Sequence, residues 1–446
     1  MTRGAPGDAS GSARMPVLLL ALLVAVRVAM VAAQPLLAAR VPEWAWSNND
    51  GYERIAVHWV ETGVYSMEPG VPTALRLPLY PALIAGAHLV AGAAAPGLVM
   101  GAQAALSIWT GGLLFGLTAG LFGRRSAVWA VLLFLFHPQV NLFVVRCATE
   151  TSYVFLLAAW AHEAVLFLRT RRARPLVLAA AAMGLSLLTR PTLLPLAGLA
   201  LMALLVWSFR DRGAWRRRLG WTALAAGTVG LLLAPWLVRN RIRSGGDWVL
   251  QTWTGQPLCQ GAYVSRHLDE FFSGRRSLTD LDQACLAEIQ VLEKRFLRTT
   301  SPEARGIARE IASDRYFRQR ARLLAMRSPM DRAKGTLRNL LWTPVLQMTW
   351  GSTRVLMLLH WPLLAFGLWG MAACARTRPH AFAEASPVWM LFGYLLLAHA
   401  AAWPQARYVL PGLVPFMGFC AFGMVRCFSA MEAWAQTRRR RRPGSI

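Results

Sequence analysis

The sequence reads SNNDGYERIA at residues 47–56, GVY at 63–65 and LRLPLYP at 75–81, directly after its first long apolar run. This stretch places an acidic residue, several aromatic side chains and a Pro-Leu-Tyr-Pro turn beside a hydrophobic segment. A carboxylate at a bilayer surface is costly unless it is solvated, paired or used in chemistry. We therefore take Asp50 as the first candidate for a chemical role.

Composition indicates a membrane protein. Of the 446 residues, 55% are hydrophobic and only 16% are charged, whereas a soluble domain has about 25% charged residues. Ten apolar runs approach or reach the roughly 20 residues that cross a bilayer, the shorter ones with help from their flanks: 15–38, 96–122, 129–143, 153–168, 176–188, 193–207, 221–238, 355–374, 387–402 and 409–425. The sequence predicts an all-α polytopic membrane protein with about ten transmembrane helices.

Arginine clusters predict the topology. They fall between or after the apolar runs, at 124–125, 169–174, 210–218, 376–378 and 438–442, which is the positive-inside pattern of cytoplasmic loops. The alternation places both termini inside and the Asp50 loop outside, with residues 79–90 as a helix at the outer interface. The run at 15–38 is longer than the hydrophobic region of a signal peptide, so we interpret it as a retained anchor.

The distribution of charged residues bears on two questions: whether the protein binds nucleic acid, and in which membrane it lies. The net charge is +26, but no soluble basic patch carries interleaved stacking aromatics, which argues against nucleic acid. The chain has many arginines and only two lysines, Lys294 and Lys334, a bias typical of GC-rich genomes. We predict a multi-pass protein of a bacterial inner membrane with its active site on the external, periplasmic side.

Three parts are expected along the chain. Residues 1–238 form an N-terminal transmembrane catalytic module that includes a first external loop at 39–95. Residues 239–351 are polar and form a small external subdomain, strand- and turn-rich at 247–261 and helical at 302–341, whose helices meet membrane lipids. Residues 352–446 form the last transmembrane helices and a basic cytoplasmic tail. Cys259 and Cys285 share the external part, and the sequence leaves open whether they form a disulfide.

Four further motifs follow the first loop in order: HP at 137–138 with TE at 149–150, LTRP at 188–191, APWLVRN at 234–240 and QARYVLP at 405–411. Together with the loop, this set resembles the GT-C superfamily of membrane glycosyltransferases. It is most similar to the family 39-like bacterial branch, which includes aminoarabinose transferases and protein mannosyltransferases. One position departs from the pattern: protein mannosyltransferases share an Asp-Glu pair in this loop, whereas Gly51 follows Asp50 here.

The resemblance implies an activity, because members of this superfamily transfer a sugar from a polyprenyl-phosphate donor to an acceptor outside the cytoplasm. An acceptor hydroxyl needs a general base, and inverting transfer needs one carboxylate and no covalent intermediate. Asp50 is our candidate for that base. Glu150 is the second candidate catalytic residue, positioned to orient the acceptor or to bind a cation. The two carboxylates leave the need for a divalent metal open, and no other cofactor is implied.

Fixed positive charge stabilises a phosphate leaving group, and arginine binds it in a bidentate manner. We assign donor-phosphate binding to Arg76, Arg190 and Arg407. Tyr52, Tyr65 and Tyr80 are candidates for contact with the sugar or the acceptor. Each assignment has a structural alternative: arginines snorkel at membrane edges, and tyrosines form interfacial belts. The aspartate of an Asx turn and a helix-start glutamate are the alternatives for Asp50 and Glu150.

Two other classes of function compete with the glycosyltransferase. A transporter or flippase of lipid-linked sugars is expected to have internal repeats and mid-membrane ionisable groups, whereas we find no repeat and few polar residues within the runs. A non-catalytic scaffold of an envelope-biogenesis complex is the other alternative, and it would tolerate the loss of Asp50. The sequence does not identify the sugar, the carrier lipid or the acceptor, which is a lipid, a glycan or a protein.

Overall fold

The computed structural model describes residues 15–40, 46, 50–209, 214–300 and 303–440 of the chain, and it is almost entirely helical. The start of the first external loop, part of the arginine cluster at 210–218 and the end of the basic tail lie outside the described residues. The transmembrane part contains α1 (Val17–Arg40), α3 (Leu79–Ala91), α4 (Ala95–Phe122), α5 (Arg124–Leu135), α6 (Pro138–Val144), α7 (Glu150–Thr170), α8 (Ala173–Leu187), α9 (Leu194–Phe209), α10 (Trp215–Ser244), α15 (Trp350–Thr377), α16 (Pro379–Glu384), α17 (Ser386–Ala401) and α18 (Ala406–Arg440).

The predicted fold class is confirmed. Seven helical segments of the described chain are long and apolar enough to cross a membrane, and an eighth span is formed if α5 and α6, bent by 59° relative to each other, are counted together. Two shorter apolar helices, α8 and α17, complete the set. Nine of the ten apolar runs each lie on a single helix of this set, and the run 129–143 crosses the bent pair α5 and α6. The predicted interfacial helix is α3, which continues into α4 through a single 3-10 turn at Gly92–Ala94.

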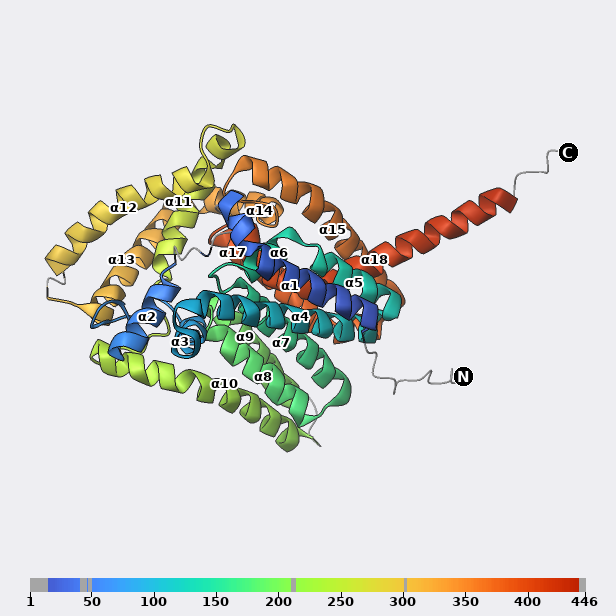
Figure 1. Ribbon diagram of the computed structural model, residues 1–446, viewed down its shortest axis with the longest axis horizontal. Helices are drawn as coiled ribbons and strands as arrows, with labels where there is room; N and C mark the ends of the chain where they lie inside the picture. The colour runs from blue at the N-terminus through green and yellow to red at the C-terminus, as the bar shows by residue number, and fades with distance from the viewer. Residues whose placement is uncertain (1–14, 41–45, 47–49, 210–213, 301–302, 441–446) are drawn as a thin grey trace.

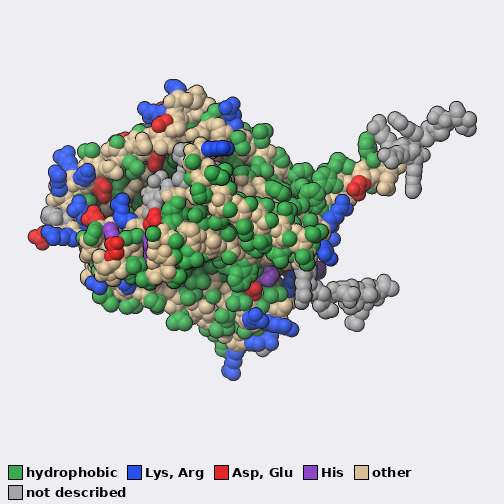
Figure 2. Space-filling view, in the orientation of Figure 1, with side chains coloured by type: hydrophobic (Ala, Val, Ile, Leu, Met, Phe, Trp, Pro, Cys, Tyr) green, Lys and Arg blue, Asp and Glu red, His purple; other side chains and the backbone are tan. Residues whose placement is uncertain are grey.

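Helix α18 is the centre of the bundle. Within its most apolar window 83% of the residues are buried, against 22% for the windows of α1, α9 and α10. Its side chains pack against α4, α5, α7, α15 and α17, and Phe416 stacks on Phe392 of α17 with ring centroids 4.4 Å apart. Figure 1 shows the end of α18 leaving the bundle as a single extended helix. Figure 2 shows hydrophobic side chains across the middle of the molecule, with Lys and Arg gathered towards its ends.

A buried arginine fixes α1 to the bent pair. Arg27 is fully buried and donates to Ser107 of α4 at 2.8 Å and to Asn141 of α6, while its guanidinium faces the ring of Phe134 at 5.5 Å. A charge inside a bilayer needs such partners. Arg27 therefore has a structural explanation and does not point to a transport pathway.

The part predicted to be external, named the external subdomain below, is a cluster of four helices at one end of the bundle: α11 (Gly255–Phe272), α12 (Leu278–Thr300), α13 (Gly306–Arg327) and α14 (Pro329–Trp342). The helices predicted at 302–341 are confirmed as α13 and α14. The prediction of strands at 247–261 is wrong: residues 247–254 are irregular with bends and contain no strand, and α11 begins at Gly255. The strands of the described chain lie instead in the first external loop, where β1 (Ser66–Glu68) pairs antiparallel with β2 (Val71–Pro72) after α2 (Tyr52–Thr62).

A backbone contact joins this subdomain to the bundle. Gly261 of α11 lies so close to Ala402, in the α17–α18 connection, that a Cβ at position 261 would collide with the carbonyl of Ala402. Glycine permits such an approach. Asn339 of α14 also donates to the carbonyl of Ala400 at 3.0 Å. The α17–α18 connection therefore lies under the external helices, immediately before Arg407.

Cys259 and Cys285 lie in one buried cluster with Ile289 and Phe317. Both are free thiols in the structure, and the Cys259 thiol donates to the Phe317 carbonyl at 3.1 Å. Burial raises the pKa of Cys259 to about 11 and that of Cys285 to about 12. In this state the two cysteines serve as packing residues between α11, α12 and α13.

The topology can be tested with single cysteines at the two ends of the bundle. Lys294 of α12 and Arg172, between α7 and α8, are both exposed. We expect a membrane-impermeant maleimide to label Lys294→Cys on intact cells and to label Arg172→Cys only after permeabilisation. The parental chain supplies the background of its own cysteines. The reverse labelling pattern would invert the topology and move Asp50 to the cytoplasmic side.

Candidate functional site

Asp50 lies at the start of α2, and its conformation depends on the residue that follows it. Gly51 has φ +79°, and a Cβ there would lie 2.5 Å from the Cε of Met67 on β1. A side chain at position 51 would therefore be strained and crowded, so the backbone at this point requires glycine. The Asp50 side chain is 41% exposed, so it is accessible from outside the bundle.

Arg76 holds Asp50 in place. Its Nε donates to the Asp50 carbonyl at 2.7 Å, and its guanidinium lies 3.7 Å from the Asp50 carboxylate. The guanidinium also stacks on the Trp253 ring, 3.4 Å from the centroid, and faces the Tyr52 ring at 5.5 Å. Arg76 thus links the first external loop to the segment that precedes α11.

Glu150 and Arg190 form a second, more deeply buried ion pair. Glu150 begins α7 and Arg190 follows α8, and Arg190 Nη2 lies 2.7 Å from Glu150 Oε1. Their side chains are 2% and 15% exposed, respectively. Arg190 also donates through Nε and Nη2 to the Thr149 hydroxyl, at 2.9 and 2.7 Å. The motifs at 149–150 and 188–191 therefore meet at one point.

Arg407 brings in the last motif. It stands in the first turn of α18 and donates to the Tyr408 hydroxyl at 2.5 Å, and the Tyr408 ring in turn faces the Arg190 guanidinium at 5.3 Å. Its Nε is buried and has no hydrogen-bond partner within the described chain. Arg407 makes no ion pair with a described carboxylate, unlike Arg76 and Arg190.

These residues form a single site. Arg407 lies within electrostatic range of both Glu150 and Asp50, and Tyr52 lies within range of Arg76, Asp50, Arg190 and Glu150. The structure therefore brings together all the catalytic and phosphate-binding residues predicted from the sequence, at one end of the bundle beneath the external helices. Three guanidinium groups and two carboxylates give the site an excess of one positive charge. Their roles stay predictions.

The three tyrosines are buried parts of the same region. The Tyr65 hydroxyl donates to the carbonyls of Arg76 and Leu77 at 3.0 and 3.2 Å, and the Tyr80 hydroxyl donates to Gln103 at 2.9 Å. The Tyr52 and Tyr80 rings meet edge to face at 5.3 Å. Tyr65 and Tyr80 thus already have structural partners, and substrate contact by any of the three stays a prediction.

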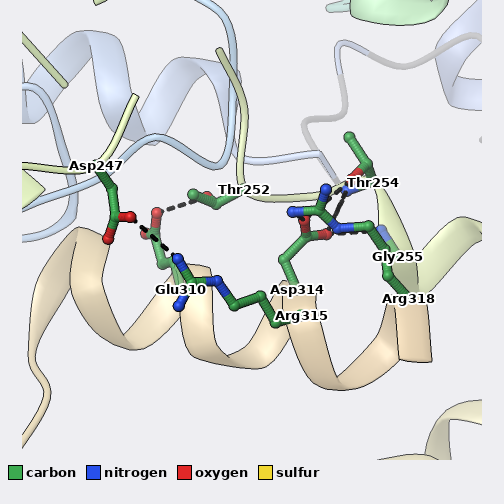
Figure 3. Close-up of polar contacts among 8 residues, drawn as sticks. All are labelled: Asp247, Thr252, Thr254, Gly255, Glu310, Asp314, Arg315 and Arg318. Atoms are coloured by element: carbon green, nitrogen blue, oxygen red, sulfur yellow. Dashed lines mark hydrogen bonds and ion pairs between the residues drawn. The ribbon is translucent and has the colours of Figure 1, made fainter. Parts of the chain in front are cut away.

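Helix α13 holds the external segment that carries Trp253 (Figure 3). Asp314 accepts from the backbone N–H groups of Thr254 and Gly255 at 2.7 and 2.6 Å. One turn earlier, Glu310 accepts from the Thr252 hydroxyl at 2.7 Å. It also accepts from the Ala74 N–H at 2.9 Å. Burial raises the pKa of Glu310, and these hydrogen bonds partly oppose the rise. Two carboxylates on α13 thereby hold the chain at Ala74, just before Arg76, and the chain at 252–255, which carries Trp253.

Sequence reasoning missed three residues near the site. Trp253 stacks on Arg76, and Gln260 of α11 donates at 2.6 Å to Asp282 of α12. Asp282 is half-buried and lies within electrostatic range of Arg407; burial raises the pKa of its carboxyl, and Gln260 and Arg407 partly oppose the rise. Because these residues lie in polar, amphipathic segments of ordinary composition, no pattern in the sequence could have singled them out.

The site offers no ready metal centre among the described residues. No three His, Cys, Asp or Glu side chains of that part of the chain group closely enough to hold an ion. Asp50 and Glu150 each face an arginine, which already occupies the space in front of one carboxylate oxygen. The chemistry that this set supports is general-base catalysis together with the binding of an anion.

Comparisons with known proteins relate the sequence to one family model and the fold to solved structures. A family model described as dolichyl-phosphate-mannose-protein mannosyltransferase matches residues 72–238. The fold is similar to that of the oligosaccharyltransferase from Archaeoglobus fulgidus in the apo form, with 14% identity over 95% of this chain and 51% of that chain and a TM-score of 0.55. The same archaeal enzyme in complex with an inhibitory peptide and a dolichol-phosphate gives 14% identity, 96% and 52% coverage and a TM-score of 0.53.

A lower TM-score of 0.40 relates the chain to ArnT from Cupriavidus metallidurans bound to undecaprenyl phosphate, with 16% identity over 92% of this chain and 77% of that chain. No curated protein sequence matches significantly. The chain spans about half the length of the archaeal oligosaccharyltransferase. It has the fold of the GT-C membrane glycosyltransferases, which confirms the resemblance seen in the sequence.

The buried ion pair predicts a large stability effect. Glu150→Gln leaves Arg190 with an uncompensated charge, so we expect a loss of about 3–5 kcal/mol in the free energy of unfolding. Glu432 is the matched control, because its pair with Arg125 at 3.8 Å is exposed, and Glu432→Gln should cost less than about 1 kcal/mol. Denaturation of the purified protein in detergent measures both. Equal effects of the two substitutions would contradict the buried pairing.

Proposed function

We propose that this protein is a glycosyltransferase that moves a sugar from a polyprenyl-phosphate-linked donor to an envelope acceptor, a lipid, a glycan or a protein, at the external face of a bacterial inner membrane. The observation that carries the proposal is the convergence of Asp50, Glu150, Arg76, Arg190 and Arg407 from four separate motifs at one membrane edge. The dolichol-phosphate bound to the archaeal oligosaccharyltransferase supports a lipid-phosphate ligand for this fold.

The charge balance of the site favours a phosphate ligand. Arg76 and Arg190 each face a carboxylate, whereas Arg407 forms no ion pair with a described carboxylate and is the guanidinium most available to an anion. A sugar ester of a polyprenyl phosphate is a phosphodiester with one negative charge, which matches the site's excess of one positive charge. When the sugar leaves, the phosphate gains negative charge, and preorganised guanidinium groups stabilise that change. We assign the phosphate to Arg407 with Arg190 beside it.

Asp50 suits the role of general base. Its carboxylate is accessible, and the backbone carbonyl of the same residue is held by Arg76. In the proposed step the acceptor hydroxyl gives its proton to Asp50 while its oxygen attacks the anomeric carbon. The bond from that carbon to the phosphate oxygen breaks, and the polyprenyl phosphate leaves with the bonding electrons. A single displacement of this kind inverts the anomeric configuration.

A lipid tail has an apolar groove available beside the site. A groove of about 370 Å³ lies between the first external loop and α10, and its lining includes Trp59, Tyr65, Pro78, Leu188 and Trp236. Pro78 and Leu188 are each two residues away from Arg76 and Arg190, respectively. We place the first isoprene units of the carrier in this groove, so that the phosphate lies at the guanidinium groups.

The three-part division of the chain is part of the proposal. Asp50, Arg76, Glu150 and Arg190 belong to residues 1–238, whereas Arg407 belongs to residues 352–446. The external subdomain, residues 239–351, adds Trp253 and Asp282 at the edge of the same site. The catalytic role is therefore shared, with the first part supplying the base and the last part supplying a phosphate ligand.

The decisive substitution is Asp50→Asn, which keeps the side-chain shape and removes the proton acceptor. Loss of a general base costs about 10²–10⁴-fold in rate, so we expect a folded, membrane-inserted variant that binds the lipid donor and hardly transfers sugar. The assay follows transfer by purified enzyme reconstituted with a polyprenyl-phosphate sugar.

Glu53→Gln is the control for this experiment. Glu53 lies on the same helix α2 and accepts from the Trp46 indole N–H at 3.1 Å, so it is engaged away from the proposed base. This variant should keep most of the transfer rate. Transfer by Asp50→Asn at the parental rate would contradict the assignment of Asp50 as the base. It would not bear on the proposed lipid-phosphate site.

Substitution of Arg407 should weaken binding of the lipid phosphate, an effect that can be measured separately from catalysis. Arg407→Gln should weaken binding of a polyprenyl phosphate by about tenfold or more, since a hydrogen bond to a charged group contributes about 1.5–3 kcal/mol. Arg407→Lys should restore part of the affinity because it keeps the charge but lacks the bidentate fork. Titration of the purified protein with undecaprenyl phosphate measures the Kd without any acceptor.

The exposed Arg354, at the external end of α15, supplies the control. Arg354→Gln removes the same charge near the same membrane face, outside the proposed site. A Kd that changes equally in Arg354→Gln and Arg407→Gln would mean that Arg407 contributes only to the general field of the surface.

A further inference from the structure

A second apolar groove runs through the bundle towards the end opposite the candidate site: its lining on α9 begins at Leu196, six residues after Arg190, and reaches Trp207. It encloses about 310 Å³ between α7, α8, α9, α10 and α17, and its lining on α7 runs from Trp160 to Arg171. Helix α7 begins at Glu150 and has 21 residues, so at 1.5 Å per residue Arg171 lies about 30 Å from the candidate site. That separation equals the thickness of a bilayer core. The end of the groove at Arg171 is therefore distinct from the site described above.

The groove is open to the surroundings of the bundle on the side of α9. Leu199, one of its lining residues, is 58% exposed, and α9 and α10 are among the least buried helices of the bundle. Within the most apolar window of each, only 22% of the residues are buried. An apolar occupant that fills the groove would give these two helices packing contacts that the protein itself does not supply.

Arg171 stands at the mouth of this groove in an unusual conformation. It is the one non-glycine residue with positive φ in the described chain, at +53°, a left-handed conformation that costs free energy for most residues. Its guanidinium lies over the Trp207 ring at 4.7 Å and over the Phe167 ring at 5.7 Å. Both rings line the groove. Arg171 makes no side-chain hydrogen bond or ion pair with any described residue.

A second guanidinium approaches the same ring. Arg218 of α10 lies 4.5 Å from the Trp207 centroid, and it donates to the Trp207 carbonyl at 3.2 Å. Burial and the neighbouring Arg218 lower the pKa of Arg171, as expected for two cations at close range. Cationic groups thus converge at the mouth of a cavity whose walls are almost wholly apolar.

A ligand with an anionic group attached to a long apolar chain would match both the arginines at the mouth and the apolar walls of the groove. A free inorganic phosphate would use the arginines and leave the groove empty. A plain hydrocarbon would fill the groove and leave Arg171, whose side chain has no hydrogen-bond or ion-pair partner among the described residues, without an anion. For a groove on the membrane-facing side of the bundle, the ligand with both an anionic group and an apolar chain is a lipid of the bilayer. The adjacent run at 169–174 contains four arginines, of which Arg169 pairs with Glu384, so the local charge favours a net negative headgroup.

We propose that this groove is a binding site for one anionic membrane phospholipid, with an acyl chain between α8, α9 and α10 and the headgroup phosphate at Arg171 and Arg218. The bound lipid completes the packing of α9 and α10 against α7 and α8. The headgroup position does not depend on the proposed transferase activity, because Arg171 and Arg218 lie at the end of the bundle opposite Asp50.

The test is native mass spectrometry of the purified protein titrated with phosphatidylglycerol or phosphatidylcholine. We expect one tightly held phosphatidylglycerol per chain and weaker binding of phosphatidylcholine. Arg171→Asn removes the charge while keeping a residue that tolerates the left-handed conformation. It should weaken phosphatidylglycerol binding by about fivefold, the effect of one interfacial arginine, and Arg171→Lys should restore most of it.

Two further variants separate the groove from general surface charge. Ala203→Phe places a ring in the groove and should remove the tightly held lipid; Ala200→Phe tests the same space should the first variant fail to fold. Arg124→Gln is the matched control, because Arg124 is exposed near the same end of the bundle, and it should leave binding unchanged. Equal affinity for the two lipids, an equal loss in Arg124→Gln, or retention in both groove-filling variants would overturn the proposal. So would full competition by inorganic phosphate, since that ligand needs no groove.

Discussion

The site depends on how three guanidinium groups are held together at one edge of a low-dielectric bundle. Like charges at short range repel strongly where water is scarce, so the cluster needs compensation inside the protein. Asp50 offsets Arg76 and Glu150 offsets Arg190, and each arginine is also tied to a neutral oxygen, the Asp50 carbonyl or the Thr149 hydroxyl. One positive charge is left over, and Arg407 is the guanidinium that forms no ion pair with a described carboxylate. That residual charge makes the site suitable for an anion.

This arrangement requires the external segments to be held firmly, because none of them is stabilised by the membrane helices alone. Glu310 and Asp314, one turn apart on α13, bind the backbone on both sides of the Arg76–Trp253 stack. Gly261 lets α11 rest on the α17–α18 connection just before Arg407. Arg239 adds a third attachment, because it donates to the carbonyls of Thr73 and Tyr65 from the end of α10. The external subdomain therefore acts as a support for the charged cluster.

Sequence patterns predicted the transmembrane architecture well because apolar length and arginine position are local properties. The motifs around Asp50, Glu150, Arg190 and Arg407 also identified residues that meet in space, although their spacing alone did not show which carboxylate would pair with which arginine. The helix at Gly255 was mistaken for turns, because its first residues are glycine, glutamine and proline and its position is fixed by Asp314, 59 residues away. Trp253, Gln260 and Asp282 were missed for the same reason: their roles arise from tertiary contacts between polar segments.

Arginines at the two ends of the bundle lie in different electrostatic environments. At the external end, arginines are buried against carboxylates and hydroxyls, so their geometry is fixed before any ligand arrives, and preorganised charge is what stabilises a developing anion. At the other end, Arg171 and Arg218 lie over a tryptophan ring beside an apolar groove, where a flexible cation can follow a headgroup at the membrane surface. Arginine content alone does not separate these roles. The difference comes from how deeply the tertiary fold buries each guanidinium and which polar groups it places around it.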